Sequence, residues 1–262
     1  MRDTLMAMRY ALPALFCMIA ATGCHGSKPP EPTPSPVAYF QADPATAASI
    51  TGTVYFRGSV PAPTKIDMSE DPACVAAHQA AHHGTPHDES LTLGTNGTIA
   101  NAFVYLKTGL EGKVFETPTI PVTIVQSGCW FSPHVFGLQT GQPMQVVNAD
   151  PVTHNIHPLA QINRAWNHSQ GPGDPPITRR FTKPEVMVSI KCNIHSWMHA
   201  YVGVLPHPYF AVTKVDGSFT IPDLPPGTYT LSVWQEKLGT QDHTITVAAH
   251  QSVTADFIYK GN

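Results

Sequence analysis

Short runs of β-branched and alternating apolar residues recur along the whole chain after Ile50, separated by clusters of Gly, Pro, Asn and Asp. Such runs predict short strands joined by tight turns, as in β-sandwiches. The predicted strands are Ile50–Phe56, Ala102–Lys107, Pro121–Gln126, Met144–Asn148, Glu185–Lys191, Tyr201–Leu205, Thr228–Trp234, His243–Val247 and Ser252–Tyr259. The segment Asp71–His83 differs, because it is rich in Ala and carries Pro72 where a first helical turn accepts proline. We therefore predict an all-β fold with one short helix.

The amino-acid composition excludes two broad classes of protein. The chain has 26 prolines in 262 residues and only 13% charged residues, against usual shares of roughly 5% and about 25%. A helix-rich enzyme needs many charged residues on its wet faces and few prolines inside its helices. With 15 Lys and Arg against 18 Asp and Glu, the chain also lacks the basic surface of a nucleic-acid-binding protein.

The N-terminus predicts export from the cytoplasm. Arg2 and Arg9 provide a basic start, and the apolar run Tyr10–Ala21 comes next. This run has the length of a signal peptide and is too short to span a bilayer.

The residues at the end of the apolar run imply a lipid anchor. The sequence Ala21-Thr22-Gly23-Cys24 resembles the bacterial lipobox, which implies that residues 1–24 are a signal peptide and that Cys24 carries the lipid. The alternative is a secreted protein cleaved near Gly23. Residues 25–44 are rich in proline and are predicted to form an extended tether. We expect a protein secreted across the inner membrane and held by its lipid in the cell envelope, facing the periplasm or the outer surface.

Two segments near the C-terminus carry the first family resemblance. Asp216–Ile221 (DGSFTI) and Leu224–Leu231 (LPPGTYTL) resemble the second half of a carboxypeptidase regulatory-like, or transthyretin-like, β-sandwich, which has a carbohydrate-binding-like fold. The first half of that pattern is matched by Gly52-Thr53-Val54, Pro61-Ala62-Pro63 and Ala102–Leu106.

The distance between these two halves implies a split domain. We predict that residues 45–117 and 207–262 form one carboxypeptidase regulatory-like sandwich and that residues 118–206 are inserted into it. The alternative is two small β domains, one after the other along the chain.

The inserted segment contains the residues with the most distinctive chemistry. Cys192–Met198 (CNIHSWM) comes directly after a predicted strand, and Asn148–Asn155 (NADPVTHN) lies upstream. A mononuclear blue-copper site needs one thiolate, two imidazoles and a weak thioether, with the Cys, the second His and the Met on one loop. The two motifs resemble the cupredoxin family, to which plastocyanin belongs. This resemblance implies a Greek-key sandwich with one type 1-like copper ion, held by His154, Cys192, His195 and Met198.

The loop is shorter than in plastocyanin-like proteins, since two residues rather than four separate His195 from Met198. The shorter spacing is that of the binuclear copper centre of cytochrome oxidase, but that centre needs two cysteines and this loop has only Cys192. A single copper ion is therefore expected. His199 is the alternative to Met198 as axial ligand, and it would lower the reduction potential and favour a non-blue site.

His157 is the alternative to His154 as the first imidazole ligand. We favour His154 because its asparagine neighbours match the family, and we expect His157 beside the site or at the surface. Trp197 either shields the metal, offers a docking face or packs as an ordinary core residue.

The remaining cysteines predict a disulfide. Cys17 lies in the signal peptide, and the assignments above leave Cys74 and Cys129, which would pair in an oxidising compartment.

A second metal site is the alternative, built from Cys74, His78, His82, Cys129 and His134. Otherwise the cluster His78, His82, His83 and His87 is expected to form a solvated face.

The sequence contains no serine nucleophile elbow, phosphate-binding glycine loop or carboxylate pair in a convincing context. We therefore predict an envelope copper protein that exchanges single electrons with a redox protein partner, an electron carrier rather than an enzyme. The alternatives are a carbohydrate- or partner-binding module in which copper is structural, and a copper redox enzyme with an open coordination position.

Overall fold

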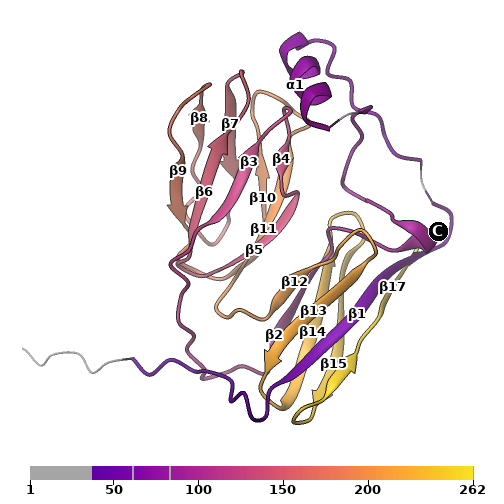
Figure 1. Ribbon diagram of the computed structural model, residues 1–262, viewed down its shortest axis with the longest axis vertical. Coiled ribbons are helices and arrows are strands. Elements are labelled where there is room, and N and C mark those ends of the chain that lie inside the picture. Colours follow the sequence, from indigo (N-terminus) through magenta and orange to yellow (C-terminus); the bar gives the residue numbers. More distant parts are fainter. Residues whose placement is uncertain (1–36, 61, 83, 262) are drawn as a thin grey trace, which may run out of the picture. The chain divides into compact units, whose positions relative to one another are not determined.

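The computed structural model describes residues 37–60, 62–82 and 84–261, shown in Figure 1. The described residues from 38 onward form one compact unit. The predicted signal peptide, Cys24, His83 and most of the predicted tether lie outside the described residues. Within the described part of the chain, no helix is long and apolar enough to cross a membrane.

The described chain is all-β with one α-helix, as predicted. The first elements are β1 (Ala48–Arg57), α1 (Pro72–His82), the short 3-10 helix η1 (Thr95–Gly97), β2 (Phe103–Thr108), β3 (Val122–Gln126), β4 (Phe131–Ser132), β5 (Val135–Gln139), β6 (Pro143–Asn148), β7 (His154–Pro158), β8 (His168–Gln170) and β9 (Ile177–Arg180). After these come β10 (Glu185–Lys191), β11 (His199–Leu205), β12 (Phe210–Val212), β13 (Ser218–Leu224), β14 (Gly227–Gln235), β15 (Gly239–Val247), β16 (Ser252–Thr254) and β17 (Phe257–Lys260).

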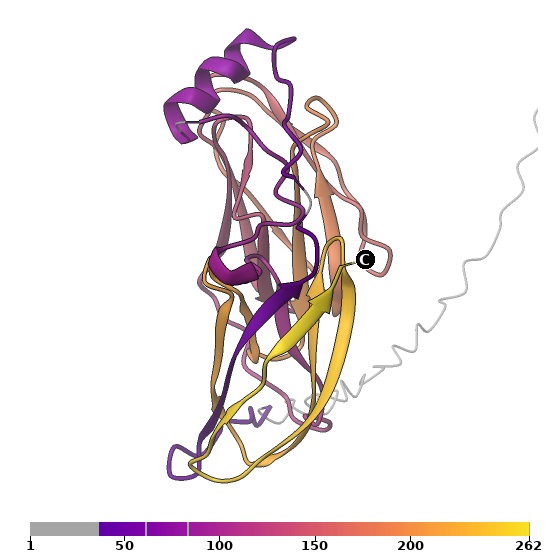
Figure 2. The same cartoon turned by 90° about the vertical axis from the view of Figure 1, so that its right-hand side faces the viewer.

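One pair of sheets is built from strands at the beginning and at the end of the described chain, and in the first of these sheets β1 is the central strand. Strand β1 pairs with β13 antiparallel and with β16 and β17 parallel, so that indigo β1 runs beside the yellow C-terminal strands in Figure 2. The other sheet has the order β12-β2-β14-β15. Alternate residues of the strands, such as Ile50 and Val54 on β1 and Leu231 and Val233 on β14, enter one apolar core.

A second pair of sheets uses only strands from the middle of the chain. Its sheets have the orders β5-β11-β10-β7-β8 and β4-β3-β6-β9, and their inward side chains, Ile124, Val146, Ile190 and Val202 among them, form a separate core. Strands β1, β2 and β12–β17 therefore share one sandwich, and strands β3–β11 form the other. The exact domain limits predicted at 117/118 and 206/207 stay predictions, because contacts unite the described residues from 38 onward in one unit.

Helix α1 lies in the connection between β1 and β2, where the sequence predicts it. The Oδ1 atom of Asp71 accepts the backbone N–H groups of Ala73 and Cys74, both at 3.1 Å, and Pro72 occupies the first turn. Asp71 thus satisfies N–H groups that have no partner within the helix.

Several strands were absent from the predicted pattern. Strand β7 reads His-Asn-Ile-His-Pro and lacks the apolar alternation of a half-buried strand, yet most of it is buried.

The predicted strand Ser252–Tyr259 is divided into β16 and β17. There the carboxylate of Asp256 accepts the backbone N–H of Thr53 at 2.8 Å, in place of a ladder bond between the strands.

The two sandwiches approach closely around Phe103. This ring is fully buried and stacks on Phe210, with ring centroids 5.5 Å apart. Two glycines of the middle sandwich make room for the pair. A Cβ atom on Gly203 would lie 2.3 Å from Phe103, and one on Gly137 would lie 2.4 Å from Phe210.

Gly203→Ala is therefore expected to lower the free energy of unfolding by about 1–3 kcal/mol, because the added methyl group overpacks the contact with Phe103. Urea unfolding measures the change. Gly84→Ala serves as the control, since a Cβ atom there meets nothing within 4 Å. Equal unfolding midpoints for the two variants would show that the sandwiches do not pack tightly at this point.

Candidate metal centre

The loop between β10 and β11 brings three of the predicted ligands to one end of the middle sandwich. The strands pair up to Lys191 and His199. Beyond that pair, the N–H of Cys192 donates to the carbonyl oxygen of Met198 at 3.0 Å, and the N–H of Met198 donates to that of His195 at 3.1 Å. These bonds close the loop, and the side chains of Cys192, His195 and Met198 are buried.

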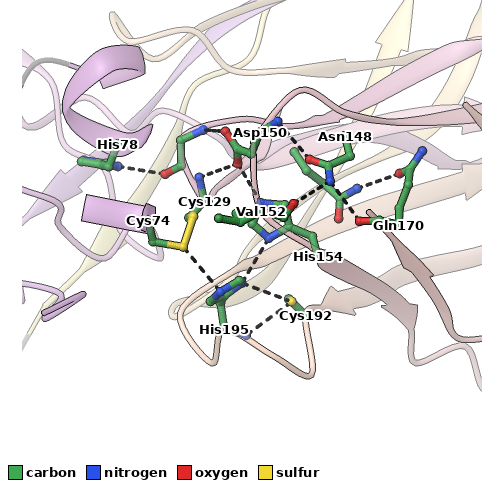
Figure 3. A network of polar contacts seen from close by, with 12 residues as sticks. Cys74, His78, Cys129, Asn148, Asp150, Val152, His154, Gln170, Cys192 and His195 are labelled. Atoms are coloured by element: carbon green, nitrogen blue, oxygen red, sulfur yellow. Dashed lines mark hydrogen bonds and ion pairs between the residues drawn. A yellow bond between two sulfur atoms is a disulfide. The ribbon is translucent and has the colours of Figure 1, made fainter. Parts of the chain in front are cut away.

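Strand β7 adds the fourth predicted ligand. It pairs with β10 and begins with His154, which is fully buried. The Nδ1 atom of His154 lies 3.1 Å from Nδ1 of His195, and the latter atom lies 3.8 Å from Sγ of Cys192, as Figure 3 shows. The three residues can offer ligand atoms within 4.8 Å of one another. Met198 belongs to the same apolar core as Cys192.

Asp150 fixes the orientation of His154 from the other side of the ring. Its Oδ2 atom lies 2.7 Å from His154 Nε2. The same carboxylate accepts the backbone N–H groups of Gly128 and Cys129 at 2.6 and 2.8 Å. Both of these residues have positive φ angles, so their N–H groups converge on the carboxylate. With Nε2–H directed to Asp150, the Nδ1 lone pair of His154 faces Cys192 and His195.

The electrostatics of the site favour a thiolate. Burial opposes ionisation of Cys192, but the hydrogen bond with His154 and those from the backbone N–H groups of His195 and Asn155 outweigh it, so the pKa of Cys192 lies below its usual value. Burial likewise opposes the charge on His154, but Asp150 and Cys192 raise its pKa. The thiolate is the form of cysteine that binds metals.

Helix α1 and a disulfide cover the outer edge of His195. Its Nε2 atom lies 3.2 Å from Oδ2 of Asp71 and 3.4 Å from Sγ of Cys74. Cys74 and Cys129 form the predicted disulfide, which links α1 to the turn before β4. These two sulfur atoms are therefore bonded to each other and do not form the alternative second metal site.

The alternative ligands His157 and His199 lie elsewhere. His157 is three residues from His154 on β7, so it faces the other side of the strand, and its Nδ1 atom lies 3.2 Å from Oδ1 of Asn193. His199 directs Nδ1 to the carbonyl oxygen of Trp197 at 2.9 Å and Nε2 to Glu236 at 3.3 Å.

The helix histidines are not all solvated. His78 is buried, with Nδ1 3.2 Å from the carbonyl oxygen of Gly128 and its ring 5.6 Å from that of Trp130. The expected solvated face is therefore wrong at His78, because α1 packs this side of the helix against the sandwich. Trp197 is half-buried and donates its Nε1–H to the carbonyl oxygen of Cys129 at 3.0 Å.

Sequence reasoning missed the contribution of Asp71 to this site. A signal for it existed, since Asp71 precedes a proline-started helix and is a favourable N-cap residue. Its contact with His195 depends on where the disulfide anchors α1, and spacing along the chain does not reveal that position.

Comparisons with known proteins match parts of the chain. Residues 199–260 match the family model of the Carboxypeptidase regulatory-like domain, and no curated protein sequence matches the chain. Among solved structures, the chain is similar to a Cu-containing nitrite reductase (NirK) from Thermus scotoductus SA-01, with 24% identity and a TM-score of 0.31 over 38% of this chain and 25% of that one. It thus spans about a quarter of the length of the nitrite reductase.

Two smaller copper proteins are matched over most of their own length. A purple cupredoxin from Nitrosopumilus maritimus has 20% identity and a TM-score of 0.28, over 32% of this chain and 98% of that one. The oxidized state of an amicyanin mutant has 16% identity and a TM-score of 0.29, over 32% of this chain and 81% of that one.

Replacing both disulfide cysteines, Cys74→Ser with Cys129→Ser, is expected to lower the free energy of unfolding by about 4 kcal/mol, because the bond closes a loop with a sequence separation of 55 residues. Urea unfolding of this variant and of the reduced wild-type protein measures the loss in two independent ways. An unchanged midpoint in both would contradict a stabilising disulfide.

Proposed function

We propose that this chain is a mononuclear copper protein that transfers single electrons. The observation that carries the proposal is the buried convergence of the Cys192 sulfur with the Nδ1 atoms of His154 and His195. A soft thiolate with two imidazoles is a donor set that suits copper.

Met198 fits the role of a weak fourth ligand. Its side chain is almost completely buried in the core that contains Cys192, and its backbone is hydrogen-bonded to both Cys192 and His195. A thioether held at the base of the loop would tune the reduction potential rather than anchor the metal. The opposite direction of His199, toward Glu236, favours Met198 for this role.

The protein residues would keep the ligand positions unchanged during turnover. A copper ion bound by these residues supplies a one-electron couple between Cu(II) and Cu(I). Asp150 holds His154, and the Oδ1 atom of Asn155 accepts the backbone N–H of Asn193 at 3.1 Å, which ties β7 to the ligand loop. Burial of the three ligands excludes water from the site. A preformed, dry site reduces the structural change that accompanies each electron transfer.

The ligand loop offers a short path to the surface for a redox protein partner. Asn193, Ile194 and Ser196 are exposed, and Ile194 presents 53% of its surface. These residues lie between the buried ligands Cys192 and His195 or directly beside them. We propose that the partner approaches the metal over this loop.

The envelope location is also part of the proposal. A disulfide such as Cys74–Cys129 forms and persists in oxidising compartments, which supports secretion. Lipid attachment at Cys24 would then hold the protein at the membrane surface.

Copper loading is expected to produce an intensely coloured Cu(II) protein with small hyperfine splitting in electron paramagnetic resonance, because the Cys192 thiolate donates charge to the metal. Cys192→Ser should abolish the colour. His157→Gln is the matched control, since this histidine lies on the same strand as His154 but faces away, and its colour should persist. A colourless protein with large splitting would contradict the proposal and favour an open, non-blue site.

Asp150→Asn is expected to weaken copper binding by about 10–100-fold, because His154 loses the charged acceptor that orients its ring. Competition with a copper chelator measures the affinity, and urea unfolding checks the fold. Asp174→Asn is the control, since Asp174 also accepts a backbone N–H, that of Gly171 at 2.6 Å, in an exposed turn. Equal copper affinities in the two variants would show that Asp150 does not support the site.

A further inference from the structure

A second group of metal-ligating side chains lies where the two sandwiches meet. His134 immediately precedes β5 and His199 begins β11, both in the middle sandwich, whereas Glu236 comes directly after β14 in the other sandwich. The Nε2 atom of His134 lies 2.8 Å from Oε2 of Glu236, and Nε2 of His199 lies 3.3 Å from Oε1. Ligand atoms of the three residues lie within 4.8 Å of one another.

The outer nitrogens of both rings are directed away from Glu236. His199 Nδ1 lies 2.9 Å from the carbonyl oxygen of Trp197. Because a carbonyl oxygen can only accept a hydrogen bond, Nδ1 carries the proton and Nε2 is left for another partner. His134 Nδ1 is buried without a hydrogen bond, and its nearest carboxylate is Glu89, with Oε2 at 3.8 Å. A metal-bound imidazole carries its proton on the outer nitrogen and donates it to an acceptor such as a carbonyl oxygen, which is the arrangement of His199.

The charge of the cluster also suits a cation. The two carboxylate oxygens of Glu236 face the two rings separately, Oε2 toward His134 and Oε1 toward His199. Its carboxylate is further oriented by the hydroxyl group of Tyr201, which donates to Oε1 at 3.0 Å. One carboxylate and two imidazoles therefore converge, and the three side chains are largely buried.

A cavity of about 360 Å³ opens beside this group. Its lining includes His199, Glu236, Ser196, Trp197, Asp88 and Lys237. An ion could reach the cluster through this cavity, and water or a small ligand could occupy the coordination positions that three protein ligands leave open.

We propose that His134, His199 and Glu236 form a second metal site, for a borderline divalent ion of the Zn²⁺ and Cu²⁺ class. The imidazole and carboxylate donors suit these ions, and the site shares no residue with the proposed copper centre. Because its ligands come from both sandwiches, the bound ion also joins the two sandwiches.

Zn²⁺ titration by calorimetry tests this site in the full chain. The Cys192→Ser background removes the thiolate of the first site, and we expect one equivalent of Zn²⁺ to bind there and to raise the thermal unfolding midpoint. Glu236→Gln and His199→Gln in that background should each lower the Zn²⁺ affinity at least tenfold, on the order expected for a lost ligand. Asp88→Asn is the matched control, because it changes a carboxylate of the same cavity that pairs with Lys237 instead, and its affinity should be unchanged.

Thermal unfolding of each variant without metal separates a loss of Zn²⁺ affinity from a loss of folding stability. This control is needed because Glu236→Gln can also weaken the ion pairs of the cluster. If Glu236→Gln and His199→Gln bind Zn²⁺ as tightly as their background, or if the background binds none, the second site is overturned and the cluster is only an ion-paired contact. A second readout is the Cu(II) spectrum of the Cys192→Ser protein, where we expect large hyperfine splitting that Glu236→Gln removes. Failure of the colour test for the first site would leave this outcome unaffected.

Discussion

The candidate copper centre depends on the hydrogen bond between the buried carboxylate of Asp150 and the imidazole of His154. A buried charge is tolerated only when it is paired and hydrogen-bonded, and Asp150 accepts from Gly128, Cys129 and His154. It therefore joins His154 to the turn that carries Cys129 of the disulfide. Through Cys74 the same connection reaches α1 and Asp71, which contacts His195. Asp150 thus holds the imidazole of His154, and Asp71 contacts the imidazole of His195. The disulfide links the segments that carry these two carboxylates, and Figure 3 shows part of this network.

The start of β11 separates the two proposed metal sites. Adjacent residues at a strand point to opposite sides. Met198 enters the core of the middle sandwich, and His199 faces Glu236 of the other sandwich. This alternation explains why His199, which neighbours an expected ligand in the sequence, belongs to a different cluster. One short stretch of chain would therefore serve both a buried site and one that borders an open cavity.

Prediction from the sequence worked where local chemistry decides the outcome. The strands rich in β-branched residues, such as β10 and β14, and the helix that starts at Pro72 were expected at these places. So was the disulfide, because an oxidising compartment and two leftover cysteines favour it. Strand β7 was missed because it buries His154 and Asn155 in place of apolar residues, and their polar atoms find partners in neighbouring loops, Asp150 for His154 and Asn167 for Asn155.

The sequence by itself determined the all-β class, the disulfide pair and the residue types that converge at the first site. The Cys192–Met198 loop is a local structure, and a hairpin brings its donors together over seven residues. Only the tertiary structure decided that α1 covers His195, that His78 is buried, and that His134 and His199 meet Glu236. These contacts join segments that are distant in the chain, and their geometry depends on how sheets and sandwiches pack, which residue spacing does not encode.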